Sequence, residues 1–145
     1  MFKIILLPTD GSELSEAAVR RGIELAKTLG AKVIGVYVMP EFHIFTYRTE
    51  MLEDTRQQYS KDCQDHAVQY LGVIEKAAKE AGISCETVST TDDHPYAGII
   101  RTAEAHGCDL IVMASHGRRG MQGLLLGSET QKVLTHGRIP VLVCR

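Results

Sequence analysis

Five short apolar runs recur along the chain, and segments with helical periodicity separate them. The runs cover residues 2–7, 32–39, 83–89, 109–114 and 140–144. Near-continuous apolar runs of this length are typical of strands buried on both faces of a parallel sheet. Alternating strands and helices give parallel pairing through right-handed crossovers, with helices on both faces. The 145 residues therefore predict one α/β domain over 1–145, a doubly wound, Rossmann-like, five-stranded parallel sheet.

The segments between these runs carry signals for the start and end of helices. We predict helices over residues 13–29, 50–81, 95–106 and 128–136. Gly30 supplies a left-handed cap after the first helix, Gly82 ends the second, and Pro95 suits the first turn of the third. The spacing in the first helix predicts one buried face made of Leu14, Ala18, Leu25 and Leu29.

Charge and composition exclude several classes of protein. Sixteen basic and 18 acidic residues leave a net charge of -2, which argues against nucleic acid or an anionic membrane as a partner. The chain has no apolar run of membrane length, and its first residues lack the pattern of a signal peptide, so we expect a cytoplasmic protein. Four widely spaced cysteines and six histidines without zinc-ligand spacing predict free thiols and no metal site.

Ligands of doubly wound sheets bind at the carboxyl ends of the strands, where the strand order reverses. With the first strand central, the relevant loops are 8–12 and 114–128. The second loop has four glycines, Arg118 and Arg119, and leads into a helix N-terminus, a combination that suits an anion such as phosphate. Ser128 begins an S-x-x-Q capping box, so it either caps its own helix or contacts a ligand. Asp10 repels phosphate and suits a ribose hydroxyl or a metal, or it caps its turn.

Several stretches resemble the universal stress protein family, in the expected order over essentially the whole chain. They are Ile4–Leu7 with Pro8-Thr9-Asp10-Gly11-Ser12, Val36–Val38, Met113–Gly117, Leu124–Ser128 and Pro140–Val143. The family's nucleotide signature is G-x2-G-x9-G-[ST]. Gly117, Gly127 and Ser128 match it, while Ala114 stands at the first glycine. The chain is therefore similar to the ATP-binding branch of the family.

The resemblance implies a role for each matching residue. Pro8, Thr9 and Asp10 would flank the adenosine, with Asp10 near the ribose, and Val38 would offer its backbone to the adenine edge. The lining of the adenosine pocket would be Met113 and Ala114. The phosphates would be held by Gly117, Gly127, Ser128, Glu129 and Thr130. On physical grounds we add Arg118 and Arg119 as phosphate ligands, and His116 as a residue that orders the loop or contacts phosphate.

The resulting functional hypothesis is a stress-response or regulatory module that binds ATP or AMP, with Mg²⁺ accompanying ATP. The alternative is an enzyme that hydrolyses ATP slowly or transfers phosphate at the same site; no P-loop is present and no catalytic residue is assigned. A flavodoxin-like or receiver domain fits less well, because Asp10 disfavours phosphate and the last strand lacks a lysine. The resemblance implies a homodimer through 140–144. The aromatic segment 42–47 is a lid, a dimer contact or an ordinary loop.

Overall fold

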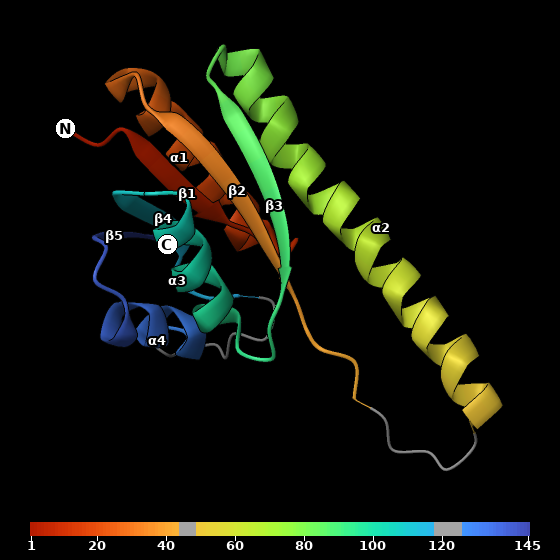
Figure 1. Cartoon of the computed structure of the whole chain (residues 1–145). Coiled ribbons are helices and arrows are strands. Elements are labelled where there is room, and N and C mark those ends of the chain that lie inside the picture. Colours follow the sequence, from red (N-terminus) through yellow and green to blue (C-terminus); the bar gives the residue numbers. More distant parts are fainter. Residues whose placement is uncertain (44–48, 118–125) are drawn as a thin grey trace.

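The computed structural model of the chain describes residues 1–43, 49–117 and 126–145. Strands and helices alternate throughout (Figure 1), in the order β1 (Ile4–Pro8), α1 (Glu13–Leu29), β2 (Lys32–Met39), α2 (Thr49–Ala81), β3 (Cys85–Thr91), α3 (Pro95–Ala105), β4 (Leu110–Ala114), α4 (Ser128–His136) and β5 (Val141–Cys144). All four strand pairs are parallel, and the sheet order is β3-β2-β1-β4-β5. The predicted fold class is confirmed, with β1 central and β5 at an edge.

Alternate residues of the central strand β1 pack into two separate hydrophobic clusters. Leu7 belongs to a cluster that includes Val19 of α1 and Ile74 of α2. Leu6 belongs to a cluster on the other side of the sheet, with Ile99 of α3 and Val133 of α4. Successive side chains of a strand point to opposite faces. The helices α1 and α2 therefore cover one face of the sheet, and α3 and α4 cover the other (Figure 1).

The buried face of α1 differs from the predicted one. Leu14 is 42% exposed and Leu29 is 37% exposed, whereas the residues that α1 buries are all small or β-branched. A methyl group on Gly22 would clash with Cδ2 of Leu7. The close packing at Gly22 favours small side chains on the inner face. Of the predicted face, Ala18 is fully buried and Leu25 packs against the core in part.

Strand boundaries move where backbone groups are used by other elements. The prediction began the third strand at Ile83, but the Ile83 N–H donates to the Ala78 carbonyl at 3.0 Å and so completes the end of α2. The first strand begins at Ile4 instead of Phe2, because the N–H groups of Lys3 and Ile4 donate to the Asp109 carboxylate. The last strand begins at Val141, one residue later than predicted.

Helix α2 is longer than the sheet that it covers. Its C-terminal half packs on β2 and β3, while its N-terminal half runs out past the carboxyl ends of the strands (Figure 1). Most side chains between residues 55 and 66 are accordingly exposed, and burial begins at Ala67. No helix in the described part of the chain combines the length and apolarity that a membrane span requires.

Candidate functional site

The candidate site lies where the sheet order reverses, as the sequence predicts. Strands β1 and β4 are neighbours, and β1 ends at Pro8 while β4 ends at Ala114. Since the two strands are parallel, the loops that follow them leave the same edge of the sheet. The segment 9–12 and the start of the second loop, residues 115–117, are therefore brought together although they are far apart in sequence.

The loop after β1 is held by a short network of local hydrogen bonds. The Thr9 N–H donates to the Val36 carbonyl at 2.9 Å, and the Gly11 N–H donates to Thr9 Oγ1 at 3.1 Å. Asp10 Oδ1 accepts the Ser12 N–H at 2.9 Å, so Asp10 does cap its turn. Ser12 in turn caps α1 by accepting the Ser15 N–H at 3.2 Å.

The second carboxylate oxygen of Asp10 faces the other loop. A methyl group on Gly117 would lie 2.6 Å from Asp10 Oδ2, well inside van der Waals contact. A side chain at position 117 would therefore displace the Asp10 carboxylate from its present place, whereas glycine leaves room for it. The carboxylate that the resemblance places near the ribose thus lies directly beside the first matching glycine of the nucleotide signature.

The two ends of the glycine-rich loop are hydrogen-bonded to each other. The Gly127 N–H donates to the Ser115 carbonyl at 2.7 Å, and a methyl group on Gly127 would lie 3.0 Å from the same oxygen. One turn into α4, Thr130 Oγ1 donates to the Ala114 carbonyl at 2.9 Å, and Thr130 is 2% exposed. These bonds fix the N-terminus of α4 against the end of β4, a role of Ser115 and Thr130 that no sequence pattern indicated.

Ser128 does not cap its own helix. The N-cap is Gly127 and has no side-chain hydrogen bond, Ser128 is the first helical residue, and the Gln131 N–H donates to the Gly127 carbonyl at 3.0 Å. The Gln131 side chain donates to the Leu126 carbonyl at 3.1 Å, so the predicted capping box is not formed. Ser128 is exposed, and its hydroxyl makes no hydrogen bond with the described residues. The first N–H groups of α4 therefore lack a side-chain cap in the described part of the chain.

Glu129, Met113 and Ala114, which the resemblance assigns to the nucleotide site, have protein contacts in the structure. Glu129 Oε2 accepts the Tyr96 N–H at 2.8 Å in the first turn of α3, and its other oxygen lies 3.5 Å from Lys132 Nζ. Met113 and Ala114 are both 7% exposed and belong to the hydrophobic clusters. Their side chains support the edge of the site from within the core.

The backbone N–H and C=O groups of Val38 point away from β3 and beyond the end of β1, where the resemblance would place the adenine. The β1–β2 pairing ends at Pro8 and Val36, and the Val36 carbonyl faces β1 by accepting the Thr9 N–H. Alternate residues of a strand direct their N–H and C=O groups to the same neighbour, so those of Val38 point to the β1 side beyond the last β1–β2 pair. The side chain of Val38 packs on Gly98 of α3, where a methyl group would lie 2.8 Å away.

His116 has one satisfied and one unsatisfied ring nitrogen. Nδ1 lies 3.0 Å from Ser115 Oγ. Nε2 is buried and has no hydrogen-bond partner among the described residues. A buried polar atom without a partner is costly, which makes Nε2 a candidate group for a ligand of this loop. Arg118 and Arg119, which we expected to bind phosphate, lie outside the described residues.

Comparisons with known proteins agree on one family. The model of the universal stress protein family matches residues 1–145. The universal stress protein MJ0531 of Methanocaldococcus jannaschii is 30% identical over 145 residues, which cover 100% of this chain and 83% of the relative. The solved structure of MJ0577, from the same organism, is 29% identical with a TM-score of 0.84 and covers 99% of this chain and 95% of that one.

Two more distant structures share the fold and were solved with a nucleotide. A universal stress protein in complex with cAMP is 22% identical with a TM-score of 0.65, over 99% of this chain and 97% of that one. The universal stress protein of Archaeoglobus fulgidus in complex with dAMP is 18% identical with a TM-score of 0.66, over 100% and 98%. Fold, residue order and the match over the full length lead to one conclusion: the chain belongs to the universal stress protein family.

Proposed function

We propose that the chain binds an adenine nucleotide, ATP or AMP, between the loops after β1 and β4, and acts as a nucleotide-dependent module in a stress or regulatory response. The proximity of Asp10 and Gly117 carries this proposal. It brings the carboxylate that the resemblance assigns to the ribose next to the first matching glycine of the nucleotide signature. The structures solved with cAMP and dAMP support it, since both ligands are adenine nucleotides on this fold.

In the proposed complex, the phosphates lie on the backbone N–H groups at the start of α4, with the Ser128 hydroxyl. This terminus has no side-chain cap among the described residues, and its dipole favours an anion. Glu129 and Thr130 hold other partners in the structure, so we assign them to support. A carboxylate such as that of Asp10 can accept a hydrogen bond from a ribose hydroxyl or coordinate Mg²⁺ that arrives with ATP.

Thermal unfolding with and without nucleotide tests the proposal. ATP or AMP at about 100 times its dissociation constant adds roughly 2.7 kcal/mol of stability, which raises the melting temperature by several degrees. The Gly127→Val variant should lose this shift, because a methyl group there already lies 3.0 Å from the Ser115 carbonyl. Gly72→Val is the matched control, since a methyl group at Gly72 meets nothing within 4 Å.

Mass spectrometry of the nucleotide retained after gentle purification then decides between ATP and AMP. A wild-type melting temperature that stays unchanged in both nucleotides at about millimolar concentration would refute the proposal. An equal shift in the wild type and in Gly127→Val would also refute it, because binding would then lie elsewhere.

We further propose a homodimer through β5, in line with the edge position of this strand. The Pro140 and Cys144 carbonyls accept N–H groups of β4, so by alternation Val141 and Val143 direct their backbone groups to the open edge. Leu142 is 45% exposed, and a shallow apolar hollow of about 390 Å³ beside it is lined in part by Phe2 and Leu29. An open edge flanked by apolar surface is a common site of pairing between chains.

A further inference from the structure

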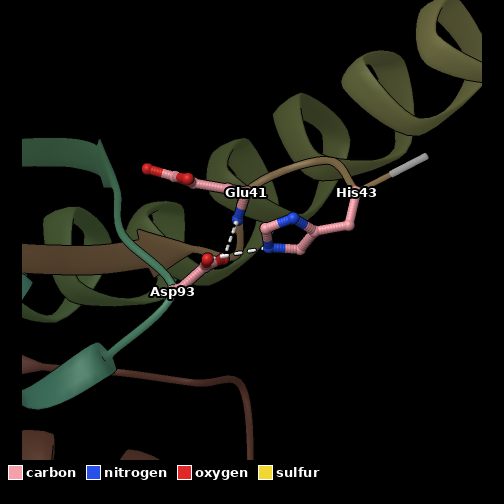
Figure 2. Close-up of side chains that lie close together, drawn as sticks. All are labelled: Glu41, His43 and Asp93. Carbon is pink, nitrogen blue, oxygen red and sulfur yellow. Dashed lines mark hydrogen bonds and ion pairs between the residues drawn. The ribbon is translucent and has the colours of Figure 1, made fainter.

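Glu41, His43 and Asp93 lie together at the carboxyl ends of β2 and β3, away from the nucleotide loops in sequence. Asp93 contacts both other residues (Figure 2): its Oδ2 lies 2.7 Å from His43 Nε2, and its Oδ1 accepts the backbone N–H of Glu41 at 3.1 Å, while the Glu41 carboxylate points away. One carboxylate oxygen of Glu41, one of Asp93 and one ring nitrogen of His43 lie within 4.8 Å of one another. All three residues are exposed.

The sheet brings these residues together independently of their own contacts. Strands β2 and β3 pair as far as Met39 and Thr91, and the Asp92 N–H continues the pairing by donating to the Met39 carbonyl at 2.9 Å. The chain therefore leaves both strands at the same edge. On the β2 side, the Tyr59 hydroxyl of α2 donates to the Pro40 carbonyl at 2.7 Å and anchors the segment that carries Glu41 and His43.

The carboxylates of Glu41 and Asp93 differ from that of the neighbouring Asp92 in how their charge is paired. Asp92 is already engaged, because the His94 N–H and the Arg101 guanidinium bind its carboxylate and lower its pKa. By contrast, neither Glu41 nor Asp93 forms an ion pair with lysine or arginine in the part of the chain that the structure describes. Two carboxylates without such a partner carry two negative charges, and a single imidazole can offset at most one of them.

We propose that Glu41, His43 and Asp93 form a binding site for a divalent metal ion of the zinc class. One imidazole nitrogen and two carboxylate oxygens are a ligand set that Zn²⁺ accepts, with water at the fourth position. Bond lengths of about 2.0–2.2 Å place tetrahedral ligands roughly 3.3 Å apart. The present separations of 2.7 to 4.8 Å bracket this value, and rotation of the exposed side chains of Glu41 and His43 closes the difference.

Such an ion would link the segment after β2 to the loop after β3. It would replace the 2.7 Å hydrogen bond between His43 and Asp93 by bonds from both segments to the metal. The spacing of histidines along the sequence could not indicate this site, because Asp93 lies 50 residues after His43 and meets it only through the β2–β3 pairing. The site takes no part in the nucleotide proposal and can be tested alone.

Calorimetric titration of the full chain with Zn²⁺, without nucleotide and after removal of metals by a chelator, tests the proposal. We expect one ion per chain in the wild type. His43→Ala and Asp93→Asn should each weaken binding by at least about tenfold, and Glu41→Gln should weaken it in the same direction. His136→Ala removes an exposed histidine of α4 and should bind as the wild type does.

All variants keep the four cysteines, so zinc bound by thiols would remain in every one of them. Absence of binding in the wild type at about 100 µM Zn²⁺ would overturn the proposal, as would undiminished binding in His43→Ala or Asp93→Asn. Melting curves of the metal-free variants show whether each is folded. Because no nucleotide is present, either result leaves the nucleotide proposal unaffected.

Discussion

The hydroxyl of Thr130 offers a sharp test of how the phosphate loop is held in place. It donates to the Ala114 carbonyl at 2.9 Å, and the residue is 2% exposed. Thr130→Val has nearly the same shape but removes the donor, leaving a buried carbonyl without this partner. The loss of one buried hydrogen bond with an acceptor left unsatisfied costs about 1–3 kcal/mol. For a domain of this size we expect the melting temperature to fall by roughly 3–10 °C.

Thr135→Val is the matched control for that variant. The Thr135 hydroxyl likewise donates to a backbone carbonyl, that of Gln131 in its own helix, at 2.8 Å. Thr135 is exposed, so water can replace this hydrogen bond. Both changes alter helix propensity equally, and the control should stay within about 0.5 kcal/mol of the wild type. Urea unfolding gives both free energies, and Thr130→Ser should recover part of the loss. Equal stabilities of Thr130→Val and Thr135→Val would refute this reasoning.

Two further predictions concern assembly and chemistry. Sedimentation at tens of micromolar should show a dimer. Val143→Pro should shift the equilibrium toward monomer, because proline removes an N–H that faces the open edge and leaves the pairing with β4 intact. A monomeric wild type or an unaffected variant would contradict the dimer. Hydrolysis of ATP with Mg²⁺ should take on the order of minutes per event, far below the roughly 1–100 s⁻¹ of kinases, since no P-loop lysine is present. Fast single-turnover hydrolysis that is lost in Asp10→Ala or His116→Ala would instead make the protein an enzyme.

The element order could be predicted from the sequence, because apolar runs and glycine caps act locally, and with it the meeting of the two loops that form the candidate site. Contacts between distant segments could not. The proximity of Leu7 to Gly22, which favours small side chains on the inner face of α1, depends on how closely helix and sheet pack. The bond from the Tyr96 N–H to Glu129 likewise depends on α3 and α4 lying side by side. Arg118 remains a predicted phosphate ligand, and the cytoplasmic location also stays a prediction.

The central position of β1 has a consequence for how the protein is made. The first strand pairs with β4 at Ile5–Leu110 and Leu6–Ile111, and Ile4 N–H meets an acceptor 105 residues away. During synthesis, β1, β2 and β3 can assemble while the partner on the other side of β1 has not yet emerged. A chain released before β4 therefore exposes an unpaired apolar strand from the middle of the sheet, which invites aggregation. Both halves of the candidate site come together only in the finished chain, so ligand binding would report completed folding and not partial assembly.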